Sequence, residues 1–245
     1  MRVAVVTGGS GGIGRAVCLR LAQAGFTVAA VGRSAERLTA LEKELPVQGY
    51  RCDVTDPDQV AALAGELTSV AVVVNNAGMA STARFEQTTV DSWDEQIRVN
   101  ATSAFLVSQA FLPQLRAAGW GRFIAVASTA SHIGARYTAA YTASKHAMLG
   151  VVRALAAEIA GTGITSNAVC PTFVRTPLTD RAIELIGERT GRDAAAAEAD
   201  LAAAAPLGRL LEPAEVAAAV AFFASEDAGC INGQSLVLDG GGLQR

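Results

Sequence analysis

The chain has 245 residues, of which 51% are hydrophobic and 18% are charged, and its formal net charge is −3. This composition allows a sizeable buried core and excludes a disordered chain, and no run of Lys and Arg points to nucleic-acid binding. The longest charge-free stretch, Val99–Leu115, contains polar residues and is shorter than the roughly 20 apolar residues of a membrane span.

The chain begins with a short apolar run, Arg2–Val6, that lacks the features of a secretion signal. Its cysteines, Cys18, Cys52, Cys170 and Cys230, are scattered without metal-ligand spacing. We therefore expect reduced thiols, a cytoplasmic location and no metal site.

Short apolar runs alternate with helical patterns along the chain. The expected strands are Val3–Thr7, Phe26–Val31, Val47–Cys52, Val70–Asn75, Phe123–Ala127, Ile164–Val169 and Ser235–Leu238. The expected helices are Ile13–Gln23, Ala35–Leu45, Asp58–Leu67, Trp93–Leu115, Thr142–Ile159 and Pro213–Ala224. The alternation predicts the α/β class, with a doubly wound parallel sheet and helices on both faces. The Ala-rich segment Ala194–Ala205 favours helix, and we expect a helical insertion there, over the site.

A glycine-rich turn lies between the first expected strand and the first expected helix. Backbone N–H groups at the start of a helix bind a pyrophosphate, and side chains would block its approach. The position of the turn favours dinucleotide binding over a merely tight connection. The residues expected to contact the cofactor here are Gly8, Ser10, Gly11, Gly12, Ile13 and Gly14.

The ends of the next strands bear on the choice of cofactor. An acid after the second strand would favour NAD, but Gly32 and Arg33 stand there. Arg33 suits a 2′-phosphate, which favours NADP(H) over NAD(H), although an ordinary solvated Arg is the alternative. Asp53 is placed to accept from the adenine amino group. The ribose side of the cofactor is expected to contact Asn76, Ala77 and Gly78, whereas Asn75 is as well explained by a structural role.

A set of polar residues predicts proton transfer. Tyr141 and Lys145 lie four residues apart on one face of a helix. A nearby ammonium lowers the pKa of a phenol, so the pair can serve as an acid and base. Ser128 follows a strand at the carboxyl edge of the sheet, where it can donate to a substrate carbonyl. Asn100 is a polar residue in an apolar helix. One explanation is a backbone irregularity holding a water that reaches Lys145, and the other is a side-chain bond to a neighbouring loop.

In this order the residues resemble the short-chain dehydrogenase/reductase family along nearly the whole chain. The matching segments are Thr7-Gly8, Gly12-Ile13-Gly14, Asn75–Gly78, Asn100, Ser128, Tyr141–Lys145, Asn167–Pro171 and Thr176-Pro177. The resemblance implies a Rossmann-type sheet of about seven parallel strands. It also implies one NAD(P)-binding domain over residues 1–245, with a lid insertion at about 177–210, and a homotetramer.

The resemblance implies a role for each residue of the polar set. Tyr141 is the acid and base, Lys145 holds the nicotinamide ribose and lowers the tyrosine pKa, Ser128 orients the carbonyl, and Asn100 completes a proton relay. The further cofactor contacts that it implies are Val54, Pro171, Thr172, Val174 and Thr176. Thr172 departs from the family, which usually has Gly after this Pro, and is expected to reshape the floor of the pocket.

The branch that the chain resembles contains 3-oxoacyl thioester reductases. The expected reaction interconverts a ketone and a secondary alcohol on a 3-oxoacyl or 3-hydroxyacyl thioester of coenzyme A or acyl carrier protein, with Ser128, His132 and Tyr141 at the substrate. The alternatives are a dehydrogenase of 3-hydroxybutyrate or of another small, sugar or steroid alcohol, a sugar epimerase or dehydratase, and a non-catalytic dinucleotide-binding sensor.

Overall fold

A seven-stranded sheet forms the centre of the molecule. The computed structural model describes residues 2–203 and 205–244. The strands are β1 (Val3–Thr7), β2 (Thr27–Gly32), β3 (Val47–Arg51), β4 (Val70–Asn75), β5 (Gly121–Val126), β6 (Ile164–Pro171) and β7 (Ser235–Leu238). Their order is β3-β2-β1-β4-β5-β6-β7, and every pairing is parallel. The predicted α/β class and parallel sheet are confirmed.

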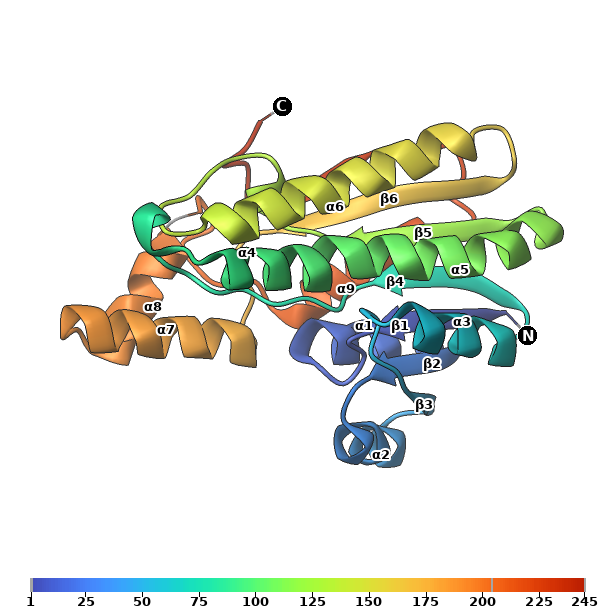
Figure 1. Ribbon diagram of the computed structural model, residues 1–245, viewed down its shortest axis with the longest axis horizontal. Coiled ribbons are helices and arrows are strands. Elements are labelled where there is room, and N and C mark those ends of the chain that lie inside the picture. Colours follow the sequence, from blue (N-terminus) through green and yellow to red (C-terminus); the bar gives the residue numbers. More distant parts are fainter. Residues whose placement is uncertain (1, 204, 245) are drawn as a thin grey trace.

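Helices cover both faces of the sheet (Figure 1). They are α1 (Gly12–Gln23), α2 (Ala35–Glu44), α3 (Pro57–Glu66), α4 (Val90–Ile97), α5 (Ser103–Ala118), α6 (Ala139–Glu158), α7 (Pro177–Thr190), α8 (Ala194–Ala203) and α9 (Pro213–Ala224). Apolar side chains of α1 and α9 pack in one core cluster with the sheet, and those of α3 and α5 pack in a second. Chain order reverses between β1 and β4, the kind of place where open α/β sheets bind ligands.

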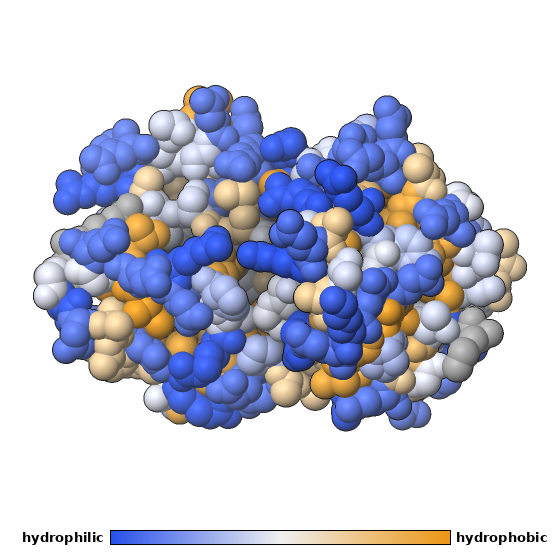
Figure 2. All heavy atoms as spheres, turned by 90° about the horizontal axis from the view of Figure 1, so that it is seen from below, coloured by the Kyte–Doolittle hydropathy of each residue, from blue (hydrophilic) through white to orange (hydrophobic). Residues whose placement is uncertain are grey.

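Burial on both faces explains why the inner strands read as continuous apolar runs. All six residues of β4 are buried, from Val70 to Asn75. A parallel sheet between two helical layers leaves no face for water, so alternation with polar residues is absent. On the outside, Figure 2 shows polar and apolar side chains interspersed over the face seen from below. Among the described residues, no helix has both the length and the apolar character that crossing a bilayer requires.

The helix predicted over Trp93–Leu115 is divided in the structure. Helix α4 ends at Ile97, a five-residue π-helical turn follows at Arg98–Thr102, and α5 begins at Ser103. The Ser103 hydroxyl donates to the Val99 carbonyl oxygen at 2.6 Å, so a side chain satisfies an acceptor within the wide turn. The turn is the backbone irregularity considered for Asn100, and it sets the position of that residue.

The insertion between β6 and α9 contains two helices. The prediction had one, over Ala194–Ala205, and missed α7; α8 ends at Ala203, and Ala204 lies outside the described residues. Helix α7 begins with Pro177 at its first turn, after the capping residue Thr176. Because α7 follows the carboxyl end of β6, both helices project beyond the carboxyl edge of the sheet (Figure 1). We call residues 177–210 the lid.

Candidate active site

The glycine-rich turn after β1 leaves the start of α1 open. Gly11 precedes α1 without any side-chain cap, and the first turn carries no acidic residue. The unpaired N–H groups of this turn suit an anionic pyrophosphate. A Cβ atom on Gly14 would overlap the carbonyl oxygen of Gly8, which itself has a φ of +64°. The tight turn therefore requires these glycines, and the chain fits a bound dinucleotide.

Residues after β4 hold this turn in place. The Thr7 hydroxyl accepts from the backbone N–H groups of Asn76 and Ala77, both at 3.0 Å. The Asn76 amide donates to the carbonyl oxygens of Thr7 and Gly8, at 2.9 and 3.2 Å. Asn76, predicted as a cofactor contact, thus uses its side chain to fix the turn.

Arg33 and Asp53 lie together where the adenosine of a dinucleotide is expected. Arg33 is exposed after β2. Hydrogen bonds from the backbone N–H and the hydroxyl of Thr55, together with the positive charge of Arg33, hold the pKa of Asp53 below its usual value, although burial opposes this. The Ser10 hydroxyl is beside Gly32, 3.5 Å from where a Cβ would stand. These side chains line one edge of the turn because β2 and β3 are paired neighbours.

The remaining predicted cofactor contacts are distributed around this edge. Ile13 packs partly against the core cluster beneath α1, and Val54 and Val174 are buried. The Cγ2 atom of Thr176 would lie 2.8 Å from a Cβ on Gly12, so the residue just before the lid touches the glycine turn. Thr172 donates from its backbone N–H to the Leu238 carbonyl oxygen at 3.0 Å. Its φ is not in the left-handed region, so the change from the family's Gly introduces no backbone strain of that kind.

The polar set predicted for proton transfer converges at the carboxyl edge of the sheet. Tyr141 and Lys145 lie in the first turns of α6, and Ser128 follows β5. The Lys145 Nζ atom donates to the Val126 carbonyl oxygen at 3.0 Å and lies 5.8 Å from the centre of the Tyr141 ring. A hydrogen bond joins Ser128 to Tyr141. The end of a strand and the start of a later helix thus bring these side chains together.

Asn100 combines a backbone irregularity with a side-chain bond to a loop, whereas the water expected at the irregularity stays a prediction. Its backbone forms part of the π-helical turn, and its side chain bonds a neighbouring loop. The Oδ1 atom accepts from Met79 N at 2.8 Å, and Nδ2 donates to Met79 O and to Ser144 Oγ, both at 2.9 Å. A Cβ on Gly78 would come within 3.0 Å of Oδ1 and 3.7 Å of Lys145 Nζ, so a glycine is needed there for close approach. Sequence reasoning missed the Ser144 contact, although Ser144 adjoins Lys145.

Burial controls the protonation of Tyr141 and Lys145. Lys145 is only 5% exposed, and burial lowers its pKa to about 8. Burial raises the pKa of Tyr141, and the hydrogen bond from Ser128 only partly opposes this. The net pKa of Tyr141 is therefore raised here, and the lowering by Lys145 that the resemblance implies stays a prediction. The penalty for burying a phenolate is the larger effect, and an amine of lowered pKa carries less charge to offset it.

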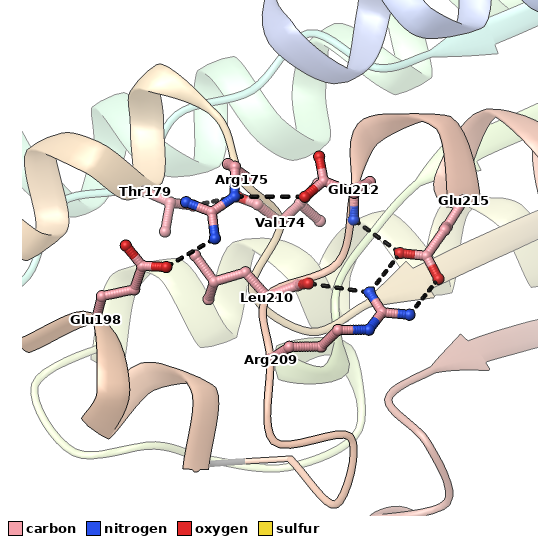
Figure 3. Close-up of polar contacts among 8 residues, drawn as sticks. All are labelled: Val174, Arg175, Thr179, Glu198, Arg209, Leu210, Glu212 and Glu215. Carbon is pink, nitrogen blue, oxygen red and sulfur yellow. Dashed lines mark hydrogen bonds and ion pairs between the residues drawn. The ribbon is translucent and has the colours of Figure 1, made fainter. Parts of the chain in front are cut away.

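Ion pairs join the second helix of the lid to the residues that flank the lid (Figure 3). The Arg175 guanidinium donates to Glu198 Oε1 at 2.7 Å and to Glu212 Oε1 at 3.3 Å. Val174 pairs with Leu211 in a parallel bridge between the two ends of the lid. Arg175 therefore links α8 to the start of α9 immediately before Thr176.

The other predicted features have the following positions. His132 is partly buried directly after the short helix Thr129–Ser131, beyond Ser128. All four cysteines are free, and Cys170 is buried beside the polar set, where its thiol has a pKa raised to about 11 by burial. Among residues 2–203 and 205–244, no cluster of His, Cys, Asp or Glu could hold a metal ion.

Comparisons with known proteins agree with this geometry. The family model described as Enoyl-(Acyl carrier protein) reductase matches residues 8–242. An acetoacetyl-CoA reductase of Rhizobium meliloti (strain 1021) is 38% identical over 98% of both chains. A D-threitol dehydrogenase of Mycolicibacterium smegmatis (strain ATCC 700084 / mc(2)155) is 37% identical over 98% of this chain and 92% of that protein.

A solved structure of a single-residue variant of actinorhodin polyketide ketoreductase with NADPH superimposes with a TM-score of 0.94. It is 33% identical, and the match covers 98% of this chain and 96% of that chain. This likeness agrees with the fold, with the open glycine turn and with the convergence of Ser128, Tyr141 and Lys145. The chain belongs to the short-chain dehydrogenase/reductase family and is an NAD(P)-dependent oxidoreductase.

Proposed function

We propose that this protein interconverts a ketone and a secondary alcohol on a 3-oxoacyl or 3-hydroxyacyl thioester, with NADP(H) as its preferred cofactor. The observation that carries the proposal is the convergence of Ser128, Tyr141 and Lys145 beside the uncapped start of α1. A small substrate bound there lies between a proton donor and the cofactor turn. The likeness to an acetoacetyl-CoA reductase over 98% of both chains supports the thioester.

Tyr141 and Ser128 act on the reacting oxygen. The bound cofactor supplies the hydride. A phenol, whose ordinary pKa is about 10, is protonated near neutral pH, so Tyr141 can donate its proton to the carbonyl oxygen during reduction. The Ser128 hydroxyl, bonded to Tyr141, orients that oxygen and stabilises the negative charge that develops on it.

Lys145 supplies the replacement proton, and the turn at Asn100 holds a water that returns a proton to Lys145. Lys145 has a pKa of about 8, which allows it to gain and lose a proton near neutral pH. Its position beside Gly78 also suits a hydrogen bond to the nicotinamide ribose. The π-helical turn at Asn100 frees backbone carbonyl groups from regular helix pairing, which suits a water that carries protons towards Lys145.

Arg33 supports the preference for NADP(H). It is exposed at the end of β2, without an acidic residue at that position, and a guanidinium matches the geometry of a phosphate. The NADPH of the ketoreductase structure supports the same preference. The other predicted cofactor residues remain part of this proposal, as does the role of His132 at the substrate.

We further propose a single domain in which the lid covers the substrate. The contact of Thr176 with the glycine turn supports this, since it couples the lid to the cofactor site. Apolar side chains exposed on three elements, Phe105 on α5, Phe222 on α9 and Leu236 on β7, support a homotetramer. The cytoplasmic location stays a prediction from the sequence.

A second candidate is the oxidation of a sugar alcohol. The D-threitol dehydrogenase is 37% identical to this chain, which is close to the 38% of the acetoacetyl-CoA reductase. Both reactions would use the same Tyr141 and Lys145, so the polar set does not separate them. The residues of the lid decide between the two substrates.

One assay tests these proposals together. NADPH and NADH oxidation are measured separately with acetoacetyl-CoA, for the native protein and for Tyr141→Phe. Crotonyl-CoA serves as the enoyl control, and D-threitol with the oxidised cofactors serves as the alternative substrate. We expect acetoacetyl-CoA reduction that is faster with NADPH and lost in the variant.

Other outcomes of the assay overturn parts of the proposal. Turnover of D-threitol without turnover of acetoacetyl-CoA would replace the thioester assignment. A Tyr141→Phe protein that keeps cofactor binding and its full role in the cell would favour the sensor.

A further inference from the structure

Ser144 connects the π-helical turn to the start of α6. Its side chain is fully buried, with an exposed fraction of 0%. The Oγ atom accepts from Asn100 Nδ2 at 2.9 Å and donates to the Tyr141 carbonyl oxygen at 2.7 Å. A single hydroxyl therefore joins Asn100 to the helical turn that carries Tyr141 and Lys145.

The chemistry of the partners determines the direction of each hydrogen bond between Met79, Asn100, Ser144 and Tyr141. Asn100 Oδ1 must accept, because its partner is the Met79 N–H group. Its Nδ2 atom then has two hydrogens, which go to the Met79 carbonyl oxygen and to Ser144. Ser144 donates its own hydrogen to a carbonyl oxygen, so it is free to accept. Every polar atom of the Asn100 side chain is thereby satisfied, and its amide has one orientation.

A helical serine that bonds a carbonyl three residues earlier is common and can be purely local. Ser144 differs because it also accepts from a side chain 44 positions away in sequence, on another element. If only the local bond mattered, losing the hydroxyl would leave Asn100 unaffected. Here the loss would leave one buried N–H hydrogen of Asn100 without its partner.

We propose that Ser144 is a positioning residue for proton transfer, acting through Asn100. It holds the π-helical turn in register with Tyr141 and Lys145, so that the Asn100 backbone stays aligned with Lys145. The inference rests on the proposed role of Asn100 in the relay. It predicts that Ser144 affects the rate of reaction and leaves cofactor binding unchanged.

The test compares Ser144→Ala, Asn100→Ala and the double variant. We expect Ser144→Ala to lower kcat by about tenfold, the scale of one lost partner at a buried donor. The KM for NADPH should stay within about twofold, because Ser144 bonds only the Asn100 side chain and the Tyr141 backbone carbonyl group. In the Asn100→Ala background, Ser144→Ala should lower kcat no further, because the two residues act as a unit. Ser144→Cys, which retains a weak acceptor, should show an intermediate loss.

Ser108→Ala is the matched control. Ser108 is also a buried serine that accepts from an asparagine, with Asn75 Nδ2 at 2.9 Å, but it makes no bond to Asn100. Both variants should destabilise the fold to a similar extent. Only Ser144→Ala should change kcat and the dependence of kcat on pH.

Three results would overturn the inference. These are an unchanged kcat in Ser144→Ala, an equal loss of kcat in Ser108→Ala, and additive losses in the double variant. Denaturant unfolding of the same set gives a readout without substrate, and additive changes there would also overturn it. An inactive native protein or an active Tyr141→Phe would instead contradict the proposed function.

Discussion

The Arg175 guanidinium lies 2.7 Å from the Glu198 carboxylate and joins the segment just before the lid to the second helix of the lid. Both side chains are partly exposed, at 49% and 37%, so the pair contributes only about 0.2–1 kcal/mol. This is too little to support the fold but enough to bias the position of the lid. Because Thr176 follows Arg175 and touches the glycine turn, we expect such a bias to reach the cofactor site.

Glu198→Gln should weaken this attachment without affecting the chemical step. We expect the substrate KM to rise by about two- to fourfold, with kcat nearly unchanged, since the pair is worth at most about 1 kcal/mol. The native KM should rise more steeply with salt than the variant's KM, because the variant keeps only the Arg175–Glu212 pair. Glu226→Gln is the control, because its partner Arg2 belongs to no part of the lid. An equal change in the control, or no change in Glu198→Gln, would contradict a role for the ion pair.

Tyr141→Phe removes the only phenolic hydroxyl in the predicted polar set. We expect kcat to fall by at least about 100-fold, the usual contribution of an acid or base. NADPH affinity, measured by fluorescence titration, should change little. A variant that binds cofactor and retains more than about a tenth of native kcat would assign proton transfer to another group.

The lowered pKa of Lys145 predicts how stability depends on pH. The folded pKa is about 8 and the ordinary value is 10.5, so between these values the unfolded chain binds more protons. Stability therefore rises with pH through this window, by up to about 3 kcal/mol from this group. The measurement is the free energy of unfolding of native protein minus that of Lys145→Met, from about pH 7 to about pH 10.5. A flat difference would mean that Lys145 has an ordinary pKa. The subtraction removes the opposing effect of Cys18 and Cys52, whereas Cys170, whose pKa Lys145 lowers, still contributes to the difference.

Arg33→Ala tests cofactor choice. Loss of a charge-assisted contact to a 2′-phosphate should raise the KM for NADPH about tenfold. The KM for NADH should stay the same, because NADH has no such phosphate. Lys43→Ala, a cation in the last turn of α2, should affect neither cofactor. Equal effects on NADPH and NADH would show that Arg33 acts only on the fold or on overall charge.

Gly14→Ala tests the tight turn. The new Cβ would overlap the Gly8 carbonyl oxygen, so the turn must open and cofactor binding should be lost. Gly65→Ala is the control, since Gly65 lies in α3 with no atom within 4 Å of the added Cβ. It should leave binding intact and stabilise the fold by up to about 1 kcal/mol. A Gly14→Ala protein with native affinity would show that the turn adapts.

The sequence by itself determined the α/β class, the seven strands and the identity of the polar set. Buried parallel strands need continuous apolar runs, and a phosphate turn needs glycines at its tight positions, so both are readable from local pattern. The order of these motifs along the chain identified the family. Strand boundaries agreed to within two residues, because apolar runs end where burial ends.

Tertiary structure decided the rest. The break in the helix at Arg98–Thr102 accompanies hydrogen bonds from Asn100 to Met79 and Ser144. The hydrophobic periodicity of the sequence does not encode such contacts. The raised pKa of Tyr141 follows from burial, which opposes the effect of Lys145 read from spacing alone. Long-range contacts and desolvation are properties of the folded chain. Only the structure therefore shows whether burial or a neighbouring charge has the larger effect on a pKa.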